Sequence, residues 1–227
     1  MSSELELTRR SLHAVAETLL AWPQSRITGT IRLYAAPGGF TTGPLGDPVS
    51  RVAVRGTDLV VTGAGGERVV PLRGTLGEVA AAAGIDLGGP VGVYESAAHP
   101  APSDVVRIDA AAASVIARAF TLGDEACGAL GAAHQPSDPP VPVLWPEHFD
   151  VGVALDDVNY GVSAGDASIP EPYAYVGPHQ ARRGDFWDQP FGSARPVREL
   201  AGVADLVAYF EEGLTRARLD PPVGGPR

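Results

Sequence analysis

The chain has 227 residues, of which 44% are hydrophobic and 19% are charged, and this composition excludes an intrinsically disordered protein. Its formal net charge of -10 excludes a general affinity for nucleic acid, because phosphate binding requires clustered Lys and Arg side chains. No stretch approaches the ~20 apolar residues that span a bilayer, and a single cysteine, Cys127, forbids an intramolecular disulfide. We therefore expect an acidic, soluble, cytoplasmic protein with neither a nucleic-acid nor a membrane partner, and its Ala, Gly, Pro and Arg bias suggests a bacterial source.

The first part of the chain predicts one helix followed by an antiparallel meander. Ser3 and Glu6 have the spacing of a capping box, and Pro23 is expected to close the helix that they begin. Residues 26–34, RITGTIRLY, alternate between apolar or small and polar side chains, as a half-buried strand does. Residues 51–72 predict three more short strands, separated by Gly-rich turns.

Two further helices precede the second half of the chain. The first begins at Thr75, with Glu78 as its capping partner and Gly84 as a left-handed stop. The second is Ala-rich and runs from Asp109 to about Leu130. The second half is then rich in strands until an amphipathic helix that starts at Pro196.

These elements predict the α+β class, with antiparallel β-sheets from two strand blocks packed with about four helices. We expect a single domain over residues 1–218. An alternative is two interlocked halves, 1–130 and 143–218, joined by the Pro-rich connection 131–142. Residues 219–227 are expected to form a disordered tail.

The segment around Asp156 and Asp157 predicts a β-hairpin whose register is self-consistent. With these two residues as the turn, every apolar side chain of the two strands falls on one face. The other face then carries Asp150 at the open end and, further along, Gly152 opposite Gly161. Opposed glycines mark the close approach of another backbone, a helix or a ligand, and a packed helix is the plainer interpretation.

The leading functional hypothesis is a small-molecule pocket in the second half of the chain, with no cofactor. Two tyrosines share a strand face there, close in sequence to several carboxylates, and an apolar pocket with a few polar groups is the usual small-molecule site. The candidate pocket residues are Asp150, Asn159, Asp166, Glu171, Tyr173 and Tyr175.

Two alternatives belong to other functional classes. His148, Asp150 and His179 have the residue types of a facial-triad metal site, which would make the chain a divalent-metal-dependent hydrolase or oxygenase. A solvated strand edge is the plainer interpretation of the same residues. The second alternative is a protein-interaction or homodimerisation module that uses the final helix and the region of Trp187.

Several segments, in their order along the chain, resemble a known family. They are SLHAVAETLL, TIRLYAAPGGFTTGPL, a Val-rich hairpin that ends in ERVVPL, LWPEHFDVGVAL, VNYGVSAGD and IPEPYAYV. Over residues 11–178 the chain resembles an uncharacterised bacterial family, the domain-of-unknown-function family five-nine-nine-six. The resemblance implies one integrated unit and carries no activity. Members of this family often have a residue other than histidine at the position of His148, and this departure weakens the metal hypothesis.

Overall fold

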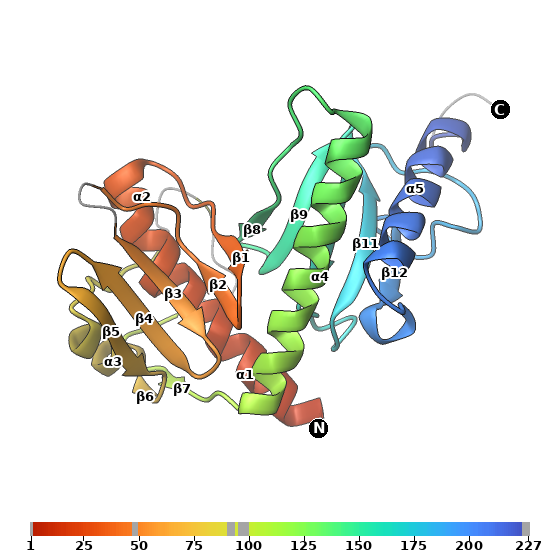
Figure 1. Ribbon diagram of the computed structural model, residues 1–227. Coiled ribbons are helices and arrows are strands. Elements are labelled where there is room, and N and C mark those ends of the chain that lie inside the picture. Colours follow the sequence, from red (N-terminus) through yellow and green to blue (C-terminus); the bar gives the residue numbers. More distant parts are fainter. Residues whose placement is uncertain (1, 47–49, 90–93, 95–99, 224–227) are drawn as a thin grey trace. The chain divides into compact units, whose positions relative to one another are not determined.

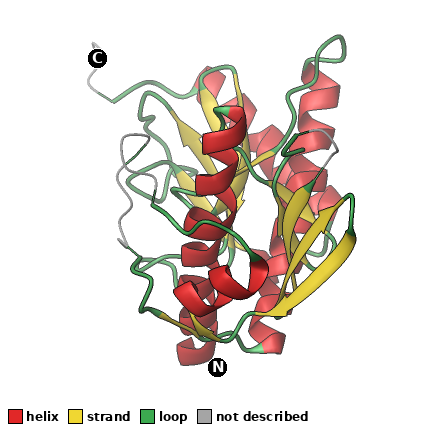
Figure 2. Ribbon diagram, turned by 90° about the vertical axis from the view of Figure 1, so that its left-hand side faces the viewer, coloured by secondary structure: helices red, strands yellow, loops and turns green. Residues whose placement is uncertain are grey.

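The computed structural model describes residues 2–46, 50–89, 94 and 100–223. It confirms the α+β class, and Figure 2 distinguishes its helices from its strands by colour. The chain divides into unit 1 (Met1–Arg118 and Leu144–Phe149) and unit 2 (Ala119–Val143 and Asp150–Arg227). The first division point therefore lies before the Pro-rich connection, within a helix, where the sequence carries no composition shift.

The amino-terminal helix continues past the proline that was expected to end it. α1 (Ser2–Val15) runs into the π-helix η1 (Ala16–Ala21) and then into α2 (Trp22–Thr28). The predicted end at Pro23 is wrong, because this proline occupies the first turn of α2, where a backbone N–H is not needed. The helix ends instead at Gly29, whose φ of 76° is left-handed.

The strand predicted over residues 26–34 is also wrong, apart from its last residue. The buried Gln24 amide donates to the carbonyl oxygens of Thr30, at 3.0 Å, and Arg32, at 2.7 Å. These bonds satisfy carbonyls that a strand would offer to a neighbouring strand. Regular strand structure starts only at β1 (Tyr34–Ala36).

Unit 1 contains an antiparallel sheet with the order β1-β2-β3-β4-β5 (Figure 1), which confirms the three meander strands predicted over residues 51–72. Its strands after β1 are β2 (Gly39–Thr41), β3 (Arg51–Arg55), β4 (Asp58–Gly63) and β5 (Gly66–Pro71). The core of unit 1 combines apolar side chains of the sheet with those of α1 and η1, among them Leu12, Val15, Leu19, Leu20, Val52, Val54 and Leu59.

The remainder of unit 1 positions one short helix and a small sheet. α3 (Leu76–Ala83) has the predicted capping box between Thr75 and Glu78, and Gly84 ends it with a φ of 68°. The strands β6 (Gly74–Thr75) and β7 (Val105–Val106) pair with each other next to the start of this helix. α4 (Ala110–His134) follows and crosses into unit 2.

Unit 2 is built on four antiparallel strands in the order β12-β11-β10-β9. One face of this sheet packs against the second part of α4 and against α5 (Val203–Leu219), with a core that includes Cys127, Val153, Tyr160, Val176 and Phe210. The strands are β9 (Asp150–Leu155), β10 (Val158–Ser163), β11 (Tyr173–Pro178) and β12 (Ser193–Pro196), and β8 (Val143–Trp145) lies where the chain passes between the units.

The carboxyl-terminal part of unit 2 differs from the prediction in two places. Pro196 ends β12 instead of starting a helix, and the 3-10 turn η2 (Val197–Glu199) separates it from α5. The tail expected to be disordered is paired over its described part. The backbone N–H of Arg183 donates to Pro221, and that of Val223 donates to Ala181, at 2.9 and 2.8 Å. Residues 224–227 lie outside the described residues.

Candidate functional site

The hairpin of β9 and β10 has the predicted register. Asp156 and Asp157 form its two-residue turn, with φ values of 52° and 58°, which is the left-handed pair that a type I′ turn requires. Asp150 pairs with Ser163 at the open end. The polar face of the hairpin is therefore placed as the sequence indicated.

The glycines of this face are covered by a tyrosine, so the expectation of a packed helix is wrong. A Cβ atom on Gly161 would lie 2.6 Å from the Tyr175 hydroxyl oxygen, and one on Gly152 would lie 2.9 Å from it. Tyr175 belongs to β11 and pairs with Gly161 in the sheet. Its ring thus occupies the space that the two glycines leave open.

The Tyr175 hydroxyl donates a hydrogen bond to the carboxylate of Asp150. Asp150 is a buried residue, 6% exposed. Burial, together with this negative carboxylate, holds the pKa of Tyr175 well above its ordinary value. The hydroxyl therefore stays protonated and acts as a donor, which is the role that a buried carboxylate needs in a neighbour.

A second tyrosine and aspartate pair lies on the same strand. The Tyr173 hydroxyl donates a hydrogen bond to Asp166 at 2.6 Å. The pKa of Tyr173 is raised mainly by burial and secondly by this hydrogen bond. The other oxygen of Asp166 accepts from the backbone N–H groups of Ser168 and Ile169, at 2.6 and 2.9 Å. This arrangement stabilises the turn between β10 and β11 and leaves its carboxylate well satisfied.

The remaining two pocket candidates lie elsewhere. Asn159 is near the turn of the hairpin, where its side-chain oxygen lies 3.3 Å from Nε2 of His179 at an exposed position. Glu171 forms an exposed ion pair with Arg198. The structure therefore brings four of the six predicted residues together as two neighbouring tyrosine and aspartate pairs, and it leaves the other two in surface contacts. Tyr175 fills the space beside Gly152 and Gly161.

The three residues of the metal hypothesis are not brought together. His179 follows β11 at the turn end of the hairpin, with Nδ1 3.8 Å from Asp157, whereas Asp150 lies at the open end. A strand of this length separates its ends by roughly 15 Å. His148 belongs to unit 1 and is exposed. Within the described part of the chain, no three His, Cys, Asp or Glu residues are grouped to hold a metal ion.

The surface expected for a partner is largely used inside unit 2. The apolar side chains of α5 are buried in its core, including Leu206, Phe210 and Leu214. Trp187 packs edge-on against Phe186, and its indole N–H donates a hydrogen bond to the carboxylate of Asp220, 3.0 Å away. A homodimer stays a prediction, but the apolar face of the final helix is not available to form it.

The structure contains a groove that the sequence did not indicate. It lies in unit 1, between the exposed side of α1, the beginning of α3 and the segment that forms β7, and its volume is about 370 Å³. Leu7, Arg10 and Ala14 come from one side of α1, because residues three and seven positions apart share a helix face. Their mixed chemistry gives no amphipathic stripe, so the helix pattern alone could not identify them.

Two hydroxyl groups of α1 accept hydrogen bonds from the segment that forms the opposite side of the groove. Ser11 Oγ accepts a hydrogen bond from the backbone N–H of Arg107 at 2.9 Å, and Thr8 Oγ1 accepts one from Asp109, also at 2.9 Å. These bonds join residues about a hundred positions apart in the chain. The segment after β7 is thereby held along α1, with the Arg107 side chain at the groove.

His13 also lines the groove, and its ring is held on two sides. It stacks on Phe149 with a centroid distance of 5.1 Å and an interplanar angle of 7°, and its Nε2 lies 2.7 Å from the carbonyl oxygen of Pro146. A carbonyl only accepts, so Nε2 carries the proton of the neutral ring. Burial, opposed by the Pro146 bond and reinforced by Arg9 and His148, lowers the pKa of His13.

Comparisons with protein-family models, with curated proteins and with solved structures gave no match. The resemblance to the domain-of-unknown-function family therefore stays a prediction. A bacterial origin and a cytoplasmic location stay predictions as well. None of the helices described is both long and apolar enough to cross a membrane.

Proposed function

We propose that this protein binds a small molecule, and that it does so in the groove of unit 1. The observation that carries this proposal is an open volume of about 370 Å³ lined by both charged and apolar side chains. Concave sites of roughly 300 to 1,000 Å³ with this mixture are the usual small-molecule sites of proteins. The prediction of small-molecule binding is thus kept, and its location moves from the second half of the chain to the first.

The polar cluster of unit 2 supports this change of location. A ligand over Gly152 and Gly161 would have to displace the ring of Tyr175 and its bond to Asp150. A ligand in the groove would enter a volume that no described side chain fills. The groove is therefore the site that a small molecule enters at the lower free-energy cost.

The test is a fragment screen read by amide chemical shifts in two-dimensional NMR. Fragments that bind are expected to shift the amides of residues 7, 10, 11, 13, 14 and 104–107, which line the groove. The proposal is overturned by fragments that shift only the amides of β9, β10 and β11, and equally by a screen of several hundred fragments without a binder.

A further inference from the structure

We propose that the groove of unit 1 takes a singly charged organic carboxylate with a short apolar body. This inference rests on the proposed function, since it names the ligand class of the same site. It draws on the charges of the groove, on the donors that are free to contact an anion, and on the apolar side chains beside them.

The charged side chains of the groove favour a monoanion. Arg10 and Arg107 each contribute one positive charge, and Asp104 contributes one negative charge. His13 is neutral near pH 7, because its pKa is lowered. The described side chains that line the groove thus carry a net charge of about +1, in a chain whose formal net charge is -10. An anion with one charge balances this site, whereas a dianion would leave excess negative charge.

Several backbone N–H groups at the groove are already hydrogen-bonded, so its arginine side chains are the main donors that an anion can reach. The N–H of Arg107 is used by Ser11, and that of Gly77, beside the groove, is used by Pro102. Residues 7–14 lie inside α1, where the N–H groups bond within the helix. Phosphate sites commonly add free N–H groups at a helix start to their cationic side chains. A guanidinium without such N–H groups still binds a carboxylate through two parallel hydrogen bonds.

Apolar side chains next to the arginines supply contacts for the body of the ligand. Leu7 is 40% exposed and Val105 is 56% exposed, and both line the groove. Leu76 and Val106 are buried and form its apolar base. A bound alkyl or aryl group would cover the two exposed side chains, which gains free energy from the removal of apolar surface from water.

The volume of the groove limits the size of that body. About 370 Å³ is near the lower end of small-molecule sites. Hexanoate is a suitable probe, because it joins one carboxylate to a five-carbon chain. Hexanamide has the same shape without the charge, and inorganic phosphate is an anion, partly doubly charged near pH 7, without the apolar body.

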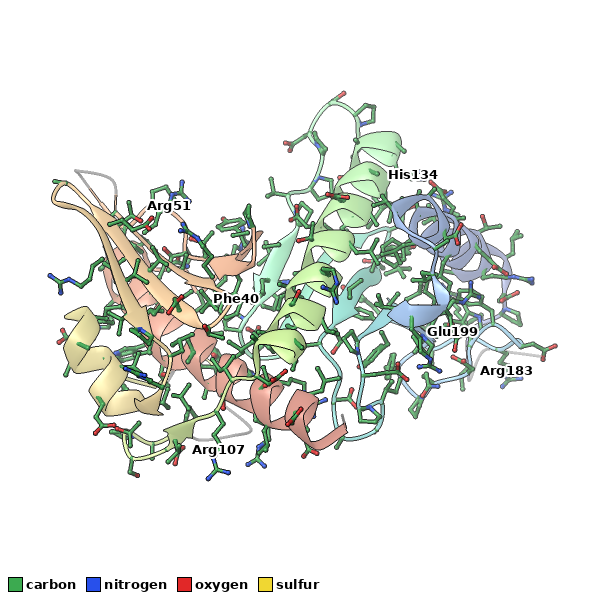
Figure 3. All side chains as sticks on the ribbon, turned by 60° about the horizontal axis from the view of Figure 1, so that its bottom comes forward. Phe40, Arg51, Arg107, His134, Arg183 and Glu199 are labelled. Atoms are coloured by element: carbon green, nitrogen blue, oxygen red, sulfur yellow. The ribbon has the colours of Figure 1, made fainter. Side chains whose placement is uncertain are left out.

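The experiment measures the affinity of these three probes by amide chemical shifts for the unchanged protein and for three variants. Arg10→Gln and Arg107→Gln each remove one groove cation. Arg51→Gln is the matched control, because Arg51 is an exposed arginine of unit 1 that does not line the groove, and Figure 3 shows it well apart from Arg107. Arg10 and Arg107 are also exposed, so the substitutions are not expected to impair folding.

We expect hexanoate to bind about tenfold more tightly than hexanamide, and to lose about tenfold in affinity in Arg10→Gln or Arg107→Gln but not in Arg51→Gln. Equal binding of hexanoate and hexanamide at the groove amides would overturn the ligand class and leave the proposed function standing. Tighter binding of phosphate than of hexanoate would do the same. Shifts confined to β9, β10 and β11 would overturn both. No shift with any of the three probes would overturn the ligand class, and the fragment screen then decides the proposed function.

Discussion

The glycine pair of unit 2 and the groove of unit 1 are two places where the chain leaves room beside polar side chains, and they differ in what fills that room. Over Gly152 and Gly161 the room is taken by Tyr175, which also satisfies the Asp150 carboxylate. Between α1 and β7 the room stays open, and exposed arginine and apolar side chains border it. Polar residues that gather in a sequence therefore do not by themselves indicate an unfilled volume.

The largest expected effect concerns the glycine pair. Gly161→Ala should lower the free energy of unfolding by about 3 kcal/mol, because overpacking of a closed site is costly. The added Cβ would lie 2.5 Å from the Val151 carbonyl oxygen and 2.6 Å from the Tyr175 hydroxyl. Urea denaturation measures the change. Gly65→Ala is the control, since a Cβ there has nothing within 4 Å, and equal losses in the two variants would show that Gly161 is not in a closed site.

A smaller effect is expected for the hydroxyl group that closes this site. Tyr175→Phe removes the donor to the buried Asp150 and should cost about 2 kcal/mol of stability, the upper range for hydrogen bonds to charged groups. Tyr173→Phe should cost only about 1 kcal/mol, because Asp166 keeps two backbone donors. Urea denaturation of both variants gives the ranking. A larger loss of stability in Tyr173→Phe than in Tyr175→Phe would contradict a greater contribution from the bond to Asp150.

His13 predicts a pH dependence in unit 1. Its pKa in the folded chain lies below the ordinary value of 6.5, so the unfolded state binds more protons than the folded state between these two values. Stability should therefore fall as the pH drops below about 6.5, and His13→Gln should remove part of that fall. Urea denaturation from pH 5 to pH 8 measures this dependence. At the reference of pH 8 the His13 ring is neutral in both the folded and the unfolded chain. Parallel profiles of the two proteins would contradict a buried neutral ring.

The smallest effects on stability are expected at the groove itself. Leu7→Gln and Val105→Thr replace exposed apolar side chains, so each should change the unfolding free energy by less than about 0.5 kcal/mol. The same variants should weaken hexanoate binding, because the apolar body of the ligand loses its contacts. Urea denaturation measures the unfolding free energy, and amide chemical shifts measure the affinity for hexanoate. A large loss of stability would mean that the groove wall supports the fold.

Local patterns in the sequence predicted some elements correctly because those elements depend on their own residues. The Asp156-Asp157 turn fixes the hairpin register, and the Thr75 capping box with Gly84 defines α3 at both ends. The strand predicted over residues 26–34 failed because Gln24 binds the carbonyls of that segment, and this contact is not part of its alternating pattern.

The candidate site was predictable only in part for the same reason. The shared strand face of Tyr173 and Tyr175 follows from a period of two, but the ring that covers Gly161 depends on which strand lies beside β10. The groove depends on bonds such as Arg107 to Ser11, between residues 96 positions apart. No periodicity or motif joins residues at that separation.

A crystal structure of the protein grown with hexanoate would show directly where the ligand binds. We expect the carboxylate within hydrogen-bond distance of Arg10 or Arg107, the alkyl chain against Leu7 and Val105, and the Tyr175 hydroxyl still bound to Asp150. Hexanoate seated on Gly152 and Gly161, with the Tyr175 ring displaced from them, would contradict the account.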